Sequence, residues 1–246
     1  MPRSAVELES ERSKGDAGSV QRNGRKRNPQ RELRILEAAL DLFGRKGFEA
    51  TTVSAICEAA GVSDATLYEY FESKEQVLFS IAELYTGREV ERLAEVREYI
   101  RDPREKLRVV IQAYLEFYER NPLYTSVALL TLKANRNFTG STAYEVVRRA
   151  SRPIVEAFEE GDEAGIFRSD IDGPLVRNMV IGFIEPLPAQ WVVTGRPEQI
   201  SEYCDTIHEM VMRAVEKRSV RTPPTLRIEL RGLNAELVST DGEEPG

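Results

Sequence analysis

Residues 60–78 read AGVSDATLYEYFESKEQVL, and this stretch decides the fold. It predicts a tight turn, a compact helix capped by Ser63, a second turn and a further helix capped by Ser73. Leu67 and Phe71 are four residues apart, so both face inward and the other side chains of the compact helix face outward. A short helix placed in this way after a tight turn is typical of a helix-turn-helix, which lays its second helix in the DNA major groove.

Two helices are expected before this stretch. The first starts near Arg31 and ends at Gly47, a residue that suits a left-handed C-terminal cap. The second is capped by Thr52 or Thr51 and ends at the tight turn. The apolar stripe of the first helix, at three- and four-residue spacing, consists of Ile35, Ala38, Ala39, Leu42 and Phe43.

A set of residues at fixed offsets gives the segment from about Ile35 to Val77 a family resemblance. The set is Gly47-Phe48, Thr51-Thr52, Ala60-Gly61-Val62-Ser63, Thr66-Leu67-Tyr68, Tyr70-Phe71 and Ser73-Lys74-Glu75. In these residues the segment resembles the DNA-binding domain of the tetracycline-repressor (TetR) family of bacterial regulators. The resemblance implies DNA contacts at Thr52, Thr66, Tyr68, Tyr70 and Lys74.

The residues that surround these positions complete the predicted DNA surface. They are the caps Thr51 and Ser63 and the outward-facing Asp64, Ala65 and Glu69. Some of the implied contacts have simpler alternatives. Tyr70 can be a half-buried core residue, Lys74 an ordinary solvated lysine and Thr52 only a helix cap. Beside a helix N-terminus that is aimed at a duplex, Lys74 is instead expected to bind a phosphate.

The predicted DNA-binding domain, residues 31–79, is acidic. It holds five Lys/Arg against nine Asp/Glu, a net charge of −4, which opposes binding to phosphates. The missing positive charge is found just upstream, where residues 21–31 read QRNGRKRNPQR. One interpretation of residues 1–30 is a disordered, solvated leader. The other is a disordered basic arm that binds DNA through Arg25, Lys26 and Arg27, so that deleting residues 1–28 weakens operator binding and its salt dependence.

Glu69 is an acid on the helix that should enter the groove. One hypothesis is that its carboxylate accepts a hydrogen bond from N4 of a cytosine. The rival hypothesis limits Glu69 to a salt bridge inside the protein.

The rest of the chain predicts an all-α protein of about nine helices, without an internal repeat. After the N-terminal three-helix domain, residues 80–218 form a helical domain, which the resemblance assigns to ligand binding and dimerisation. In the family the last two helices pair with their copies as a four-helix bundle; alternatively, their apolar faces close the core of the monomer. Residues 219–246 form a tail with a short strand near residues 226–230 and a disordered end at residues 239–246.

The resemblance implies a small-molecule effector inside the C-terminal domain. The aromatic and apolar candidates for the cavity wall are Tyr114, Phe117, Tyr118, Leu129, Phe138, Tyr144, Phe158, Phe183 and Trp191, which can also be simple core. The segment LKANRNFTGSTAY, residues 132–144, resembles regulators that sense fatty acyl thioesters. Lys133 and Arg136, with Arg148 or Arg149 nearby, would then bind the phosphates of an acyl-CoA. A lipophilic drug or an aromatic metabolite is the alternative effector.

Composition excludes several other classes of protein. The chain has 246 residues, 41% of them hydrophobic, and a net charge of −7, so it is not a sequence-blind polycation. It shows no membrane-spanning stretch and no signal-peptide core, which predicts a cytoplasmic protein. Cys57 and Cys204 are expected to be buried free thiols.

An enzyme is the competing functional class, and the sequence gives it little support. The single histidine, His208, lies near the expected dimer face, and no residue spacing indicates a metal or a cofactor. The sequence therefore predicts a homodimeric regulator that binds a double-stranded DNA operator and is released from it by a small apolar effector. A helical dimeric adaptor or sensor that does not bind DNA is the alternative. The operator sequence, the effector and the sign of regulation stay open.

Overall fold

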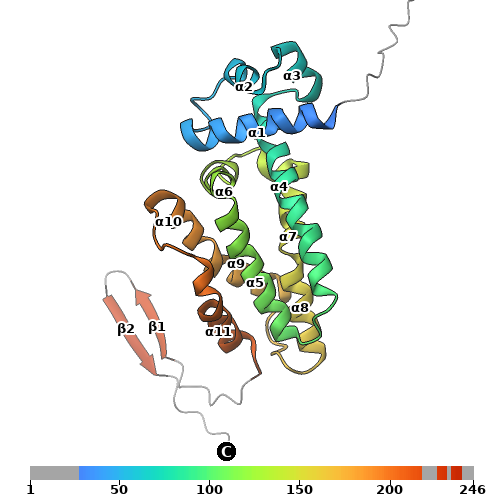
Figure 1. Ribbon diagram of the computed structural model, residues 1–246. Coiled ribbons are helices and arrows are strands. Elements are labelled where there is room, and N and C mark those ends of the chain that lie inside the picture. Colours follow the sequence, from blue (N-terminus) through green and yellow to red (C-terminus); the bar gives the residue numbers. More distant parts are fainter. Residues whose placement is uncertain (1–27, 218–225, 232–233, 240–246) are drawn as a thin grey trace, which may run out of the picture.

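The computed structural model describes residues 28–217, 226–231 and 234–239. A head of three helices lies at one end of a longer helical body, and a two-stranded hairpin follows the last helix in the chain (Figure 1). The predicted all-α class is confirmed for the head and the body. The predicted basic arm, with Arg25, Lys26 and Arg27, lies outside the described residues, as does the tail beyond Ser239.

The head consists of α1 (Pro29–Lys46), α2 (Val53–Ala60) and α3 (Asp64–Tyr70). Thr52 caps α2 by accepting a hydrogen bond from the Ala55 N–H (3.1 Å), and Ser63 caps α3 through the Thr66 N–H (3.1 Å). Gly61 has the left-handed conformation that the tight turn needs, with φ 64° and ψ 43°.

The start and the end of α1 differ from the sequence prediction. The helix begins at Pro29 because Asn28 caps it through the N–H of Gln30 (3.0 Å). At its other end Gly47 has φ 83° but ψ 156°, so it is not the predicted left-handed cap. Only its positive φ explains why glycine is needed there.

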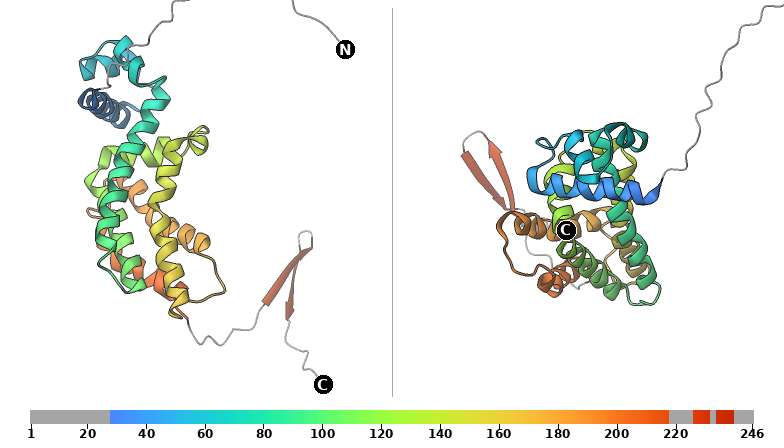
Figure 2. Two further views of the ribbon diagram at one scale, coloured as in Figure 1. Left: turned by 90° about the vertical axis from the view of Figure 1, so that its right-hand side faces the viewer. Right: turned by 45° about the horizontal axis from the view of Figure 1, so that its top comes forward.

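The body is built around α4 (Lys74–Arg97), which runs from the head along the body (Figure 2). Ser73 caps α4 as predicted, and Asp102 caps the next helix, α5. The elements after α4 are α5 (Pro103–Arg120), α6 (Pro122–Val127), the π-helix η1 (Ala128–Leu132), the 3₁₀ turn η2 (Phe138–Gly140), α7 (Thr142–Ala150), α8 (Arg152–Glu163), α9 (Gly173–Ile184), α10 (Pro186–Thr194), the 3₁₀ turn η3 (Ser201–Tyr203) and α11 (Cys204–Val215).

The eleven α-helices of the described residues correspond to the nine that the sequence predicts. Two of the predicted helices are each broken in two, one at Ser151 and one at Glu185. Prolines shortly after each break, Pro153 and Pro186, explain the interruptions because proline cannot donate a helical hydrogen bond.

The body packs α4 against α7, and α5 against both α8 and α11. In its core the rings of Phe158 and Phe167 stack at 5.7 Å with an interplanar angle of 2°. Both free thiols, Cys57 and Cys204, are buried as predicted. His208 bonds through Nε2 to the carbonyl of Arg104 (3.1 Å), which fits a structural role.

The head contacts the body where α6 packs against α1 (Figure 1). A β-carbon at Gly44 would lie 2.8 Å from Cδ2 of Leu123, so a larger residue there would force the Leu123 side chain to move. The head is therefore held by two elements, α4 through the chain and α6 through this contact.

The predicted strand in the tail is one half of a hairpin. β1 (Leu226–Arg231) pairs antiparallel with β2 (Asn234–Ser239), in a register from Leu226 opposite Ser239 to Arg231 opposite Asn234. No helix among the described residues is long and apolar enough to cross a bilayer.

Candidate functional site

The outer face of α3 is exposed as a DNA-reading helix requires. Leu67 and Phe71 are buried beneath it, while Ala65 and Glu69 are exposed and Tyr68 has 55% of its surface exposed. In Figure 1, α2 and α3 lie at the end of the molecule that is farthest from the body. This end is free to meet a duplex, and Tyr68 is its largest exposed side chain.

Two of the predicted DNA contacts are core residues in the structure. Tyr70 has only 6% of its surface exposed, and its hydroxyl accepts a hydrogen bond from the Asn28 N–H (2.9 Å). The core alternative is therefore the correct one for Tyr70. Thr51 is 1% exposed and donates its hydroxyl to the carbonyl of Gly47 (2.8 Å), so its predicted DNA contact is wrong.

Lys74 is neither a solvated lysine nor a free phosphate ligand. Its Nζ donates to the carbonyls of Phe48 (2.7 Å) and Thr51 (2.8 Å) and lies 4.3 Å from the centre of the Phe48 ring. Two of its three N–H groups are thus used inside the protein, which leaves one for a phosphate. Lys74 primarily ties the first turn of α4 to the loop between α1 and α2.

The two acids on α3 have different surroundings. Asp64 accepts a hydrogen bond from the Ser54 hydroxyl (3.2 Å). Burial, with a further contribution from the Asp64 carboxylate, raises the pKa of the Cys57 thiol to about 11. Glu69 is exposed and has no hydrogen bond or ion pair with any described residue. No described residue therefore serves as a salt-bridge partner of Glu69, which leaves the rival hypothesis without support in the described chain. Base recognition by Glu69 is the hypothesis to test.

Replacing Glu69 by glutamine should relax the base preference at one operator position. An amide both donates and accepts, so it no longer selects the amino group of cytosine as a carboxylate does. We expect discrimination at that position to fall by about tenfold, the order expected for loss of one base contact of 1–3 kcal/mol. Binding to a library of operator variants would measure it. A preference identical to that of the wild type would exclude a base contact by Glu69.

The structure refines the deletion that tests the basic arm. Removing Asn28 would also remove the cap of α1 and the hydrogen bond to Tyr70, so the deletion should end at residue 27. We expect this variant to bind its operator more weakly and to lose roughly one unit of the slope of log K against log salt per phosphate contact. Thermal unfolding controls for the stability of the head. A slope unchanged by the deletion would show that the arm makes no phosphate contact.

A cavity of about 590 Å³ lies in the body between α4, α5, α7 and α9. Six of the predicted wall residues line it, namely Tyr114, Phe117, Tyr118, Lys133, Phe138 and Tyr144. The volume is in the range of small-molecule sites, and the wall is mostly aromatic and aliphatic. This part of the chain can enclose an apolar ligand.

The other predicted wall residues lie elsewhere. Phe158 is used in the core stack with Phe167, and Phe183 is 39% exposed on α9. Leu129 and Trp191 pack, partly buried, against the core outside the cavity, and Arg136 is exposed on the loop after η1. These five residues do not line this cavity, because residues on one helix divide between an inner wall and an outer face that the sequence does not distinguish.

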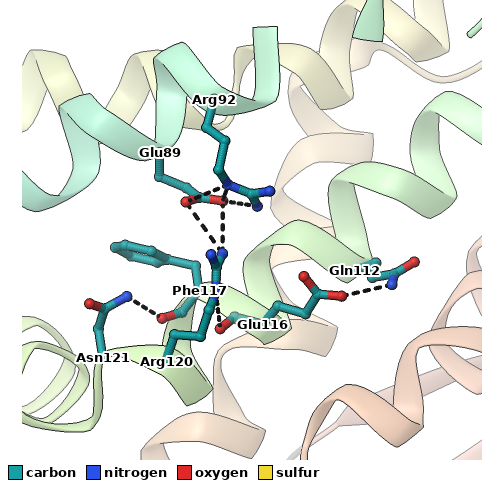
Figure 3. A network of polar contacts seen from close by, with 7 residues as sticks. All are labelled: Glu89, Arg92, Gln112, Glu116, Phe117, Arg120 and Asn121. Carbon is teal, nitrogen blue, oxygen red and sulfur yellow. Dashed lines mark hydrogen bonds and ion pairs between the residues drawn. The ribbon is translucent and has the colours of Figure 1, made fainter. Parts of the chain in front are cut away.

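Most of the charged groups in the cavity wall are paired. Lys133 forms an ion pair with Glu185, and Glu89 is held by Arg92 (2.5 Å) and Arg120 (3.5 Å), as Figure 3 shows for Glu89. The opposite charges within these ion pairs cancel, so these groups offer little net charge to a ligand.

Two arginines of the wall are different. Arg177 bonds only to the amide oxygen of Asn178 (3.0 Å), and Arg148 lies 3.8 Å from Glu145 in a pair that is 61% exposed on both sides. An exposed pair at this distance is weak. Arg148 and Arg177 therefore offer positive charge to an anionic group at the cavity.

Buried tyrosines give the cavity wall its hydrogen-bonding groups. Burial raises the pKa of Tyr114, Tyr118 and Tyr124, the last to about 12. The carboxylate of Glu185 raises the pKa of Tyr114 and Tyr118 further. Tyr124 shares a buried hydrogen bond with Thr86 (2.7 Å). All three hydroxyls therefore remain neutral donors at physiological pH.

Sequence reasoning missed Glu89, Tyr124, Arg177 and Glu185 as wall residues. Arg177 carries one usable signal, since it is the only charged residue between Pro174 and Ile184 in a largely apolar helix. The other three have none, because their orientation is set by the packing of helices that are distant in sequence. No group of three His, Cys, Asp or Glu suited to a metal ion occurs in the described ranges.

Comparisons with known proteins cover both parts of the chain. Residues 35–81 match the family described as "Bacterial regulatory proteins, tetR family", and residues 84–214 match that described as "YsiA-like protein, C-terminal region". The second match alone spans more than half of the chain.

Among individual proteins, the "Fatty acid metabolism regulator protein" of Bacillus subtilis is 24% identical over 186 residues, 76% of this chain and 96% of the relative. The repressor KstR2 of Mycolicibacterium smegmatis is 26% identical over 59% of this chain and 72% of its own. Two solved structures are also similar. FadR of Bacillus halodurans has a TM-score of 0.70 and 26% identity, covering 76% of this chain and 96% of its own. FadR of Bacillus subtilis, in complex with stearoyl-CoA, has a TM-score of 0.69 and 25% identity, covering 73% and 97%.

Proposed function

Because the chain belongs to the TetR family of bacterial transcriptional regulators, we propose that it is a repressor released from its operator by a long-chain acyl-CoA. The head (α1–α3), called the reading head from here on, and the cavity lie in one chain, as a ligand-responsive DNA-binding regulator requires. The observation that carries the choice of effector is the pairing of an apolar wall with Arg148 and Arg177 at the same cavity.

An acyl-CoA fits this arrangement on both counts. Its chain can be buried against the aromatic wall, which is favourable at about 25 cal/mol per Å² of apolar surface. Its phosphates can accept hydrogen bonds from Arg148 and Arg177, and guanidinium groups suit phosphate geometry. The related FadR of Bacillus subtilis, solved with stearoyl-CoA, supports the same class of ligand for this chain.

A neutral lipophilic compound is the second candidate, and a smaller set of observations favours it. A solved structure of the ketosteroid transcriptional regulator KstR2 of Mycobacterium tuberculosis has the same fold, which is therefore not limited to fatty acid regulators. Such a ligand would leave Arg148 and Arg177 without an anionic partner. The acyl-CoA is therefore the stronger proposal.

A homodimer is part of the proposal. A helix-turn-helix reader needs a second copy to meet two half-sites about 34 Å apart. The exposed apolar side chains Leu175 and Phe183 on α9 and Met210 on α11 supply a face that a partner can cover. Gel filtration that gives only monomer at micromolar concentration would contradict this part.

The test is a mobility shift with DNA from beside the protein's own gene, with and without palmitoyl-CoA. We expect a shifted band that palmitoyl-CoA removes and that free coenzyme A and palmitate, as controls, leave in place. Failure of the full chain to shift this DNA at low salt would favour the helical adaptor or sensor that does not bind DNA. A shift that a lipophilic compound removes and palmitoyl-CoA does not would favour the second candidate. A regulator with this activity acts in the cytoplasm.

A further inference from the structure

The loop after η1, residues 133–137, contacts both the cavity and the start of α4. Lys133 of this loop lines the cavity, as do Phe138 and Thr139 of η2, which follows it. Between them, the side-chain amide of Asn135 donates to Glu75 (2.8 Å), and that of Asn137 donates to both oxygens of the same carboxylate (3.2 Å each). The loop thus contacts the cavity with one set of residues and the start of α4 with the other.

Glu75 lies in the first turn of α4, directly beside Lys74. Lys74 in turn holds the carbonyls of Phe48 and Thr51 in the loop before α2. A short series of hydrogen bonds therefore leads from the cavity loop, through two adjacent residues of α4, to the reading head. Its end links are hydrogen bonds, and its central link is the helix backbone between Lys74 and Glu75.

The segment before the loop is the π-helix η1, and its Ala128 and Leu132 also line the cavity. π-Helical turns are rare and occur mostly as single turns at functional sites. A ligand bound against this wall would contact Leu132, which precedes Asn135 by three residues and Asn137 by five.

We propose that Asn135 and Asn137 are positioning residues that couple the cavity to the reading head through Glu75. The inference rests on the proposed function, since it assigns the route by which that effector acts. With the cavity empty, the two amides hold Glu75 and fix the angle of α4 and of the loop that Lys74 grips. An effector that moves the cavity loop withdraws the amides, and the population shifts to a head orientation that does not fit the operator.

The principal variant replaces Asn135 and Asn137 together by alanine in the full chain. Wild-type release, measured as the ratio of operator Kd with and without palmitoyl-CoA, should lie in the usual range of about 5- to 150-fold. In the double variant we expect this ratio to fall to about twofold or less, as the coupling free energy is lost. The Kd for palmitoyl-CoA in the absence of DNA should stay close to that of the wild type, because neither side chain lines the cavity.

A second pair of changes separates coupling from a general loss of stability. Asn135→Asp with Asn137→Asp keeps side-chain size but turns attraction to Glu75 into repulsion, so it should also abolish the release ratio. Gln112→Ala is the matched control, because it removes an amide–carboxylate hydrogen bond of the same kind, to Glu116 (2.7 Å), away from the route (Figure 3). We expect Gln112→Ala to keep the wild-type ratio.

Amide hydrogen exchange tests the route without an effector. In the alanine variant the amides of residues 48–52 and 74–78 should exchange faster than in the wild type, while those of α5 should not. Wild-type release in the alanine variant, or unchanged exchange at both segments, overturns the inference. If palmitoyl-CoA fails to release the wild type, the proposed effector is wrong, and hydrogen exchange alone then decides whether the loop positions the head.

Discussion

Replacing Arg148 and Arg177 together by glutamate should weaken binding of palmitoyl-CoA by about 100- to 10,000-fold and leave operator binding without effector unchanged. Each arginine is assigned a charge-assisted hydrogen bond to a phosphate, and such bonds contribute about 1.5–3 kcal/mol. Two of them amount to about 3–6 kcal/mol, and each 1.4 kcal/mol is a factor of ten in Kd. The two carboxylates introduced also repel the phosphates.

The measurement is titration calorimetry with palmitoyl-CoA, followed by the operator mobility shift. Arg149→Glu with Arg101→Glu is the matched control, since it changes the net charge equally at two exposed arginines outside the cavity. We expect that control to bind palmitoyl-CoA with an affinity near that of the wild type. Equal loss in both double variants would mean that only the overall charge matters. Tight binding by the Arg148→Glu, Arg177→Glu variant would show that the phosphates bind elsewhere.

The second large effect is loss of stability in alkali. Tyr118 and Tyr124 are buried, and their pKa values are raised above the ordinary value of 10.0, that of Tyr124 to about 12. Between pH 10 and about pH 12, the tyrosines of the unfolded chain lose their protons while the two buried tyrosines of the folded chain retain theirs. Unfolding is then favoured as pH rises, so the stability that these groups contribute is fully present below pH 10 and is lost above it.

The expected slope is about 1.4 kcal/mol per pH unit for each group, or about 3 kcal/mol per pH unit for the two together. Over two pH units the loss is comparable to the 5–15 kcal/mol of a typical domain. Urea unfolding at a series of alkaline pH values measures it. Tyr118→Phe removes one titrating hydroxyl and should reduce the slope by about 1.4 kcal/mol per pH unit. A stability that stays constant well above pH 10 would contradict the burial of these hydroxyls.

Local features of the fold could be predicted from the sequence because they depend on neighbouring residues. The caps at Thr52, Ser63 and Ser73 each involve an N–H three residues away, and all three are present as predicted. The inward pair Leu67 and Phe71 follows from helical spacing alone. The shape of the head is determined at this local level.

The site depends on contacts that are distant in sequence, and there the prediction was incomplete. Lys74 satisfies carbonyls 26 and 23 residues away, at Phe48 and Thr51, which no local pattern indicates. Phe158 and Tyr124 are both buried aromatic residues, yet only Tyr124 lines the cavity. The difference arises from the angle at which the helices pack. That angle is set by all the contacts between the helices and not by any local sequence pattern.

The exposed acids of α3 have a consequence for how the regulator is distributed in a cell. Nonspecific affinity for DNA is almost entirely electrostatic, and a genome offers about 10⁶–10⁹ competing sites. We expect a head that presents Glu69 to the duplex to be poorly retained by unrelated sequence wherever the basic arm does not offset it, so that the chromosome binds few copies nonspecifically. A small pool of protein can then keep its operator occupied, and copies released by the effector do not linger on the DNA nearby.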